Sequence, residues 1–282
     1  MHDVTVSRPP VALDGAGRAP RPGGEAVLEA IGITTCFGEL PANEDVDLRV
    51  TAGRVTALIG PNGAGKTTLF NVMTGVVRAQ RGRLLAFGSE VEAPTPARMA
   101  RLGLIRTFQD LKVVRRLSVF DNVVIGAGRA QRPSLPGAVL GLPSARRKQA
   151  AIRAAAEWAI DFVGLTGLAG TYVGDLPYAA ERRVEIARAL AARPKVLLLD
   201  EPTAGMGPGE TIEIGGLLSR VVDDLGIPVF VIEHDMRVVR GFADWVYVLE
   251  QGRIITDGLP EKVLADGRVI ESYLGRRRAS GA

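Results

Sequence analysis

The chain has 282 residues, enough for one large or two small domains, and its 46% hydrophobic and 23% charged residues are ordinary for a globular protein. No apolar run approaches the ~18 residues of a membrane-spanning helix, and the first residues lack the apolar stretch of a secretory signal, so we expect a cytoplasmic protein. The single cysteine, Cys36, excludes an intramolecular disulfide, and the presence of only two histidines argues against structural zinc. The net charge of +4 and 5% aromatic residues, without a basic, aromatic-bearing face, predict no nucleic-acid partner.

The pattern along the chain predicts an α/β fold. Residues 1–24 are rich in Gly, Pro and Arg without an apolar period, so we expect a disordered tail. After them, β-branched or leucine-rich runs alternate with helical patterns, which indicates a largely parallel sheet covered by helices. We assign the α/β core to residues 25–94 and 175–250, a helical subdomain to residues 95–174, and a C-terminal hairpin, helix and basic tail to residues 251–282.

Three strongly apolar runs are the strand candidates that matter for function: RVTALIG at 54–60, KVLLLD at 195–200 and PVFVIEH at 228–234. Each run ends in residues able to contact phosphate, metal or water. Ligands of open α/β sheets bind at the carboxyl edge of the strands, so we expect these three ends to form one site.

Other elements are predicted from their periodicity. Apolar residues at helical spacing indicate a helix from about Ala145 to Val163, after a Pro/Gly-rich interruption. The segment WVYVLEQGRIITDG at 245–258 predicts two strands joined at Gln251 and Gly252. A short helix is expected near Pro260.

The segment GPNGAGKTT fits the pattern G-x-x-x-x-G-K-[ST] and lies between a predicted strand and a helix, the context that this phosphate-binding loop requires. Its glycines let successive backbone N–H groups and the following helix N-terminus face phosphates. Lys66 would reach the β- and γ-phosphates, and Thr67 would offer a hydroxyl to Mg²⁺. The alternative is a Gly-rich turn that caps a helix. The expected nucleotide-binding residues are Gly60, Pro61, Asn62, Gly63, Ala64, Gly65, Lys66, Thr67 and Thr68.

Two acids and a histidine follow the other apolar strands. Asp200 suits a water-bridged contact with Mg²⁺, and the adjacent Glu201 can orient or deprotonate an attacking water. His234 could hydrogen-bond the γ-phosphate and that water. The same sequence would arise if the two acids only ended a strand and the histidine were structural. The phosphate loop upstream favours a catalytic role for all three residues.

With these motifs the sequence resembles the ATP-binding subunit of an ABC transporter, from about Leu28 to Gly275. The resemblance implies a P-loop NTPase core with antiparallel β elements and an inserted helical subdomain, with ATP and Mg²⁺ as ligands. LLLDEP matches the second Walker motif, and His234 matches the switch histidine. RTFQ, ending at Gln109, matches the glutamine loop, so Gln109 would sense Mg²⁺ and water. Phe37 matches the aromatic residue that stacks on adenine, although a core phenylalanine would look the same.

Several stretches resemble the ATPases of branched-chain amino-acid importers, among them GLIRTFQDLKVVRRLSVFDNVVIGAG and VIEHDM. The resemblance implies a pair of ATPase chains, often different, at the cytoplasmic face of the membrane beneath two permease subunits, fed by an external solute-binding protein. The permease should dock near Lys112 to Leu117. The transported molecule is not encoded in this chain, so amides, urea or aromatic acids fit as well as branched-chain amino acids.

The signature motif of the family, L-S-G-G-Q, is degenerate here. The chain has Leu176, Pro177, Tyr178, Ala179 and Ala180 in its place, and of these Ala179 and Ala180 also depart from the branch that it resembles. In the family this motif lies against the partner's ATP, where a β-carbon would obstruct close approach, above all at positive φ.

Gly207 also departs from the family, which usually has Asn or Asp there facing the partner. Because Lys66, Asp200, Glu201 and His234 are all present, we expect an ATPase in an asymmetric heterodimer. The alternatives are a regulatory nucleotide-binding subunit with weak turnover, which the retained Glu201 argues against, and a soluble ABC ATPase acting on nucleic acid or ribosomes.

Overall fold

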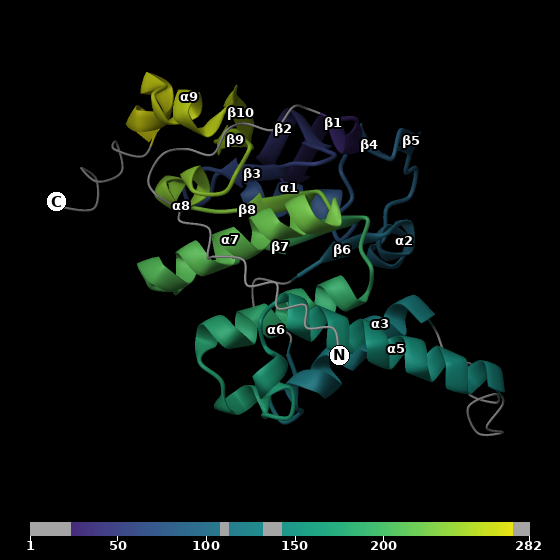
Figure 1. The fold of residues 1–282 in the computed structure, drawn as a ribbon. Helices are drawn as coiled ribbons and strands as arrows, with labels where there is room; N and C mark the ends of the chain where they lie inside the picture. The colour runs from purple at the N-terminus through teal and green to yellow at the C-terminus, as the bar shows by residue number, and fades with distance from the viewer. Residues whose placement is uncertain (1–23, 108–112, 132–142, 273–282) are drawn as a thin grey trace.

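The computed structural model describes residues 24–107, 113–131 and 143–272, arranged as two β-sheets and a set of helices (Figure 1). The first sheet is antiparallel, with strand order β2-β1-β4-β5. The second has six strands in the order β10-β9-β3-β8-β7-β6. The sequence resemblance to a P-loop core with antiparallel β elements is therefore confirmed at the level of the fold.

The antiparallel sheet is built from two long, paired strands and two short ones. Its strands are β1 (Ala26–Phe37), β2 (Leu40–Thr51), β4 (Arg81–Ala86) and β5 (Ser89–Glu90). Buried and exposed residues alternate along the second half of β2, which places one face of the sheet on the core and the other in solvent.

The six-stranded sheet has the three apolar strands of the sequence at its centre. Its strands are β3 (Val55–Ile59), β6 (Leu104–Arg106), β7 (Val196–Asp200), β8 (Val229–Ile232), β9 (Trp245–Glu250) and β10 (Arg253–Gly258). Strands β9, β3, β8, β7 and β6 are parallel, and β10 pairs antiparallel with β9. Gln251 and Gly252 form the hairpin turn, both with positive φ, so the hairpin predicted at these two residues is confirmed.

The helices lie on both sides of the six-stranded sheet. They are α1 (Lys66–Met73), α2 (Pro96–Leu102), α3 (Val119–Gln131), α5 (Pro143–Phe162), α6 (Tyr178–Ala191), α7 (Pro208–Leu225), α8 (Met236–Arg240) and α9 (Pro260–Leu264), with 3₁₀ turns η1 (Thr166–Leu168) and η2 (Val173–Asp175). Helix α5 and the helix at Pro260 agree with the predicted helices.

Helices α3, α5 and α6 pack together at the end of the molecule opposite the antiparallel sheet (Figure 1). Helix α6 contacts both α3 and α5. It approaches α3 closely, since Gly126 on α3 lies against the backbone of α6 at Arg188. The domain boundaries expected from the sequence stay predictions.

Alternate residues of the central strands face two different hydrophobic cores. Leu197 and Leu199 of β7 belong to the core shared with the helical group and α7. Val196 and Leu198 belong to the core that also contains α1 and the antiparallel sheet. Because both faces are buried, the strands read as continuous apolar runs rather than alternating ones. No helix in the described part of the chain is long and apolar enough to span a membrane.

Candidate nucleotide site

The phosphate loop joins β3 to α1, as the motif requires. Gly60 has φ of 156° and Gly65 has φ of 102°. A β-carbon at Gly60 would overlap the carbonyl oxygen of Leu249, and one at Gly65 would overlap that of Ala42. Only glycine satisfies both the backbone conformation and the space at these two positions. The loop is therefore a cradle of bare backbone at the start of a helix.

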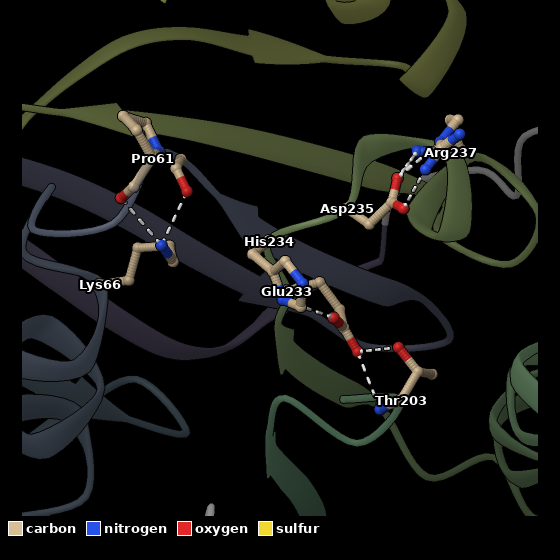
Figure 2. Close-up of polar contacts among 8 residues, drawn as sticks. Pro61, Lys66, Thr203, Glu233, His234, Asp235 and Arg237 are labelled. Atoms are coloured by element: carbon tan, nitrogen blue, oxygen red, sulfur yellow. Dashed lines mark hydrogen bonds and ion pairs between the residues drawn. The ribbon is translucent and has the colours of Figure 1, made fainter. Parts of the chain in front are cut away.

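Lys66 is the first residue of α1, and its ammonium group is buried against its own loop. Its Nζ donates to the carbonyl oxygens of Gly60 at 2.7 Å and Pro61 at 3.1 Å (Figure 2). Thr67 follows it and is exposed, whereas Thr68 is half-buried. The arrangement places one cation and one accessible hydroxyl at the mouth of the cradle.

Two contacts that the sequence motif does not include hold the loop from outside. The buried Asn43 of β2 donates from Nδ2 to the carbonyl oxygen of Gly65 at 3.2 Å. Gly252, in the β9–β10 turn, donates its N–H to the carbonyl oxygen of Ala64 at 2.9 Å. Both come from segments distant in sequence, so no local pattern could have revealed them.

The carboxyl ends of β3, β8 and β7 lie side by side, as predicted. The N–H of Glu201 donates to the carbonyl oxygen of Ile232 at 3.0 Å, and the N–H of Glu233 donates to that of Leu58 at 3.1 Å. These bonds continue the sheet one residue past the strands. The segments that carry Asp200, Glu201 and His234 are therefore fixed next to the strand that leads into the phosphate loop.

Asp200 ends β7 as a buried carboxylate with 2% exposure. Burial raises its pKa, Arg106 opposes this rise, and the adjacent Glu201 adds to it. Its Oδ2 lies 3.9 Å from Nη2 of Arg106, and its Oδ1 has no hydrogen-bond partner among the described residues. A buried carboxylate oxygen without a partner fits a site for a cation or an ordered water.

Arg106, on β6, was not singled out from the sequence. Its Nη1 donates to Oδ1 of Asn71 at 3.0 Å and to Oγ1 of Thr74 at 2.9 Å, both on α1. Its guanidinium also lies over the ring of Phe70. Burial lowers the pKa of Arg106, although Asp200 opposes this effect. The side chain thus ties the helix of the phosphate loop to β6 and faces the acid of β7.

Glu201 leaves the strand in a left-handed backbone conformation, with φ of 47°. A positive φ in a residue with a side chain is uncommon and is concentrated at turns and functional sites. The residue is half-buried, whereas Asp200 is buried. The two neighbouring acids therefore occupy different environments, as expected if they have different roles.

Glu233 lies between the switch histidine and the loop after Glu201 (Figure 2). One of its oxygens, Oε1, accepts from the N–H of Thr203 at 3.1 Å and from Oγ1 of Thr203 at 2.7 Å. Its Oε2 lies 3.9 Å from Nδ1 of His234. Burial raises the pKa of Glu233, against the hydrogen bonds of Thr203 and the nearby His234. Sequence reasoning gave no role to either Glu233 or Thr203. Glu233 lies within the VIEHDM stretch, but its pairing with Thr203 joins residues 30 positions apart.

Phe37 ends β1 with 58% exposure, so it is not a core residue. It pairs with Leu40 at the start of β2, three residues before Asn43, which contacts the phosphate loop. Its ring is open to solvent, and stacking on adenine stays a prediction. Gln109 and Lys112 lie outside the described residues.

The degenerate signature forms the start of α6. Leu176 is buried and Pro177 precedes the first turn. The hydroxyl oxygen of Tyr178 accepts a hydrogen bond from Nη2 of the buried Arg182 at 3.2 Å. Ala179 is 9% exposed and lies within the helix without positive φ, and the half-buried Ala180 packs against the core. Backbone strain at Ala179 is therefore not the obstacle that a β-carbon was expected to create. Pro177 and Ala180 lack the hydroxyl and the carboxamide that Ser and Gln of the family motif would offer at these positions.

Gly207 precedes α7 and is exposed. Its N–H donates to Oε2 of Glu210 at 3.0 Å, which satisfies one free donor at the helix start. Glycine offers no side chain at this position for contact with another chain.

The site fits a triphosphate with a divalent cation. The glycine cradle and helix start suit phosphate groups, Lys66 matches their charge, and the orphan oxygen of Asp200 lies at an adjacent strand end. Within the described residues, no group of three His, Cys, Asp or Glu side chains could hold a metal alone.

Comparisons with known proteins agree with this geometry. Residues 43–204 match the family described as ABC transporter. The chain is 36% identical over 250 residues to the high-affinity branched-chain amino acid transport ATP-binding protein BraF of Pseudomonas aeruginosa, covering 88% of this chain and 98% of BraF. It is also 36% identical over 252 residues to LivG of Escherichia coli, covering 89% and 98%.

Solved structures of cassettes are similar as well. An ATP-binding cassette of an ABC transporter in its ADP conformation is 32% identical with a TM-score of 0.78, covering 89% of this chain and 99% of that one. A nucleotide-free cassette is 31% identical with a TM-score of 0.76, covering 88% and 99%. The chain therefore belongs to the ABC transporter family, as an ATP-binding subunit that hydrolyses ATP in coupling to transport.

Proposed function

We propose that this chain powers an ABC importer for branched-chain amino acids or related small polar solutes. The observation that carries the substrate class is similarity over nearly full length to BraF and LivG, two proteins named for branched-chain amino acid transport. The solute pocket would lie on other chains, so the site described above accounts for the energy source and not for solute selection.

In this proposal the phosphate loop binds the triphosphate of ATP through its backbone N–H groups and the start of α1. Lys66 reaches the β- and γ-phosphates, and Phe37 stacks on adenine. The close packing at Gly60 and Gly65 supports this role, because the carbonyl oxygens of Leu249 and Ala42 leave no space for side chains there and so fix the path of the loop backbone.

Thr67, Asp200 and Gln109 would hold Mg²⁺, with Asp200 acting through water. When bound, Mg²⁺ neutralises the charge that develops on the β- and γ-phosphates. Glu201 orients or deprotonates the attacking water, and His234 hydrogen-bonds the γ-phosphate and that water. The different burial of Asp200 and Glu201 supports the division of labour between the two acids.

We place the chain at the cytoplasmic face of the membrane, paired head to tail with a second ABC ATPase chain beneath two permease subunits that receive solute from an external binding protein. In such a pair, residues 176–180 act on the partner's ATP. Pro177 has no hydroxyl and Ala180 no carboxamide to donate to a phosphate. We therefore propose that the partner is a different chain with an intact signature, rather than a second copy.

The second candidate is a regulatory subunit that closes on ATP with weak turnover. Ala179 and Ala180 favour it, because they remove the usual groups at the partner site. The retained Glu201, set in a strained conformation next to Asp200, argues against it, since a subunit without turnover needs no carboxylate for water.

Solute uptake by cells that make this chain tests the proposed function. We expect Glu201→Gln to lower the uptake of labelled leucine, isoleucine and valine at least tenfold, while Glu92→Gln, an exposed surface control, leaves it unchanged. A loss confined to urea, short amides or aromatic amino acids would reassign the solute within the same function. Unchanged uptake of every solute would contradict a role in import.

A further inference from the structure

Glu233 is a fully buried acid, and the motifs of the sequence assign it no role in ATP hydrolysis. It has 0% exposure and directly precedes His234, at the end of β8. Its Oε1 receives two hydrogen bonds from Thr203, one from the N–H and one from the hydroxyl. Two donors on one oxygen hold the carboxyl group in a single orientation.

The second oxygen of this carboxyl group faces the switch histidine. Oε2 has no hydrogen-bond partner among the described residues, and Nδ1 of His234 is 3.9 Å away. The His234 side chain is 51% exposed, so a small rotation of the ring can close the distance to the 2.7–3.2 Å of an N–H···O bond. Asp235, the next residue, is turned toward Arg237 and away from Glu233 (Figure 2).

We propose that Glu233 is a positioning residue: held by Thr203, it accepts the Nδ1 proton of His234 and so fixes the tautomer and direction of the imidazole ring. A buried acceptor without a partner is unfavourable, and this imidazole is a group within 4 Å that can donate to it. In a neutral imidazole, the partner of one nitrogen decides which nitrogen carries the proton. Nε2 is then left as the free acceptor.

This arrangement would couple two parts of the site. Thr203 lies two residues after Glu201, and its N–H and hydroxyl are bound to the residue next to His234. Glu233 thus joins the segment of the acid that acts on water to the segment of the histidine. The kinetic consequence rests on the proposed function, in which Nε2 meets the γ-phosphate and water, whereas the tautomer itself does not depend on it.

The direct test is the ¹⁵N spectrum of the imidazole in the nucleotide-free chain. The sequence has only two histidines, so His2→Gln leaves His234 as the sole reporter. At about pH 8.5, where an ordinary imidazole is neutral, we expect the Nδ1–H form to predominate. Predominance of the Nε2–H form in this otherwise wild-type chain would overturn the proposal, with no further variant required.

Glu233→Gln gives an opposite and specific result. The backbone N–H of Thr203 can only donate, so the carboxamide oxygen must face it and the NH₂ group must face Nδ1. The proposal therefore expects the histidine to switch to the Nε2–H tautomer. Asp235→Asn removes the same charge one residue after His234 and should leave the tautomer as in wild type. An unchanged tautomer in Glu233→Gln would overturn the proposal.

Kinetics provides the second measurement. With partner chains present, Glu233→Gln should lower kcat for ATP about tenfold with KM changed less than twofold, because it alters the ring that acts on the γ-phosphate and not the phosphate cradle. A merely structural role would lower the fraction of active enzyme without switching the tautomer. If wild type had the Nδ1–H tautomer but no ATPase activity even with partner chains present, the proposed function would fail while this inference stood.

Discussion

At the scale of single residues, Glu233 is a buried ionisable group whose charge opposes folding. Burial raises its pKa above the ordinary value of 4.5. A raised pKa in the folded state contributes stability that is present below the unfolded value and is lost as the pH rises through the folded value. The ionised acid therefore lowers the folding stability of the chain, as expected for a residue whose role is in the nucleotide site.

The matching prediction concerns unfolding in urea as a function of pH. Above pH 4.5, the free energy of unfolding of wild type should fall relative to that of Glu233→Gln, because only wild type must ionise a buried carboxyl. The glutamine keeps an oxygen for Thr203, so packing is preserved. Glu92→Gln, on the surface, is the control and should follow wild type. A difference between wild type and Glu233→Gln that is constant with pH would contradict this account.

The residues that the sequence could predict are those whose chemistry depends on local spacing. The phosphate loop and the acids at positions 200 and 201 are of this kind, because strand, turn and helix follow one another directly. Asn43 and Arg106 could not be predicted, since each acts on a segment far away in the chain. Their partners are set by tertiary packing, which leaves no periodic signal.

At the scale of elements, the contact between α3 and α6 depends on one glycine. A β-carbon at Gly126 would overlap the carbonyl oxygen of Arg188 on α6. Two residues further along α3, a β-carbon at Gly128 would meet nothing within 4 Å. The same helix therefore contains a glycine needed for close approach and one that is not.

This pair gives a prediction with an internal control. Gly126→Ala should lower the free energy of unfolding by about 2–3 kcal/mol, because α3 and α6 must move apart. Gly128→Ala should raise it by about 0.5–1 kcal/mol, because alanine favours a helix over glycine. Urea unfolding monitored by circular dichroism measures both. Equal effects of the two changes would show that the helices do not meet at Gly126.

The elements themselves were predicted unevenly. Fully buried strands such as β7 were recognised because continuous apolar runs with polar ends are distinctive. The packing of α6 against α3 and α5 could not be predicted, since its sequence does not show which neighbours it meets. Those neighbours become visible only in three dimensions.

At the scale of the whole molecule, the order of the central strands creates the site. β8 lies between β3 and β7, although it follows both in the chain. This order brings the switch histidine between the phosphate loop and the two acids. The sequence indicated that three strand ends converge, but it contained no information about which strand lies in the middle.

The central claim is that this chain has a complete ATP site and a weak signature. In the proposed head-to-tail pair, one chain would supply residues 60–68, 200, 201 and 234 to each ATP site, and the other chain would supply the signature segment at 176–180. A pair of identical chains would combine two complete loops with two weak signatures. Losing one charge-assisted hydrogen bond to the γ-phosphate weakens the transition state by about 1.5–3 kcal/mol, or one to two decades of rate.

The most direct test is the rate of Mg²⁺-dependent ATP hydrolysis by the purified chain alone. We compare wild type, the double variant Ala179→Gly/Ala180→Gln, and each of these with Glu201→Gln. The account predicts that wild type alone is nearly inactive, that the double variant is at least tenfold faster, and that Glu201→Gln abolishes the gain. If wild type alone already hydrolysed ATP as fast as the double variant, the signature would tolerate alanine and the need for a different partner chain would be contradicted.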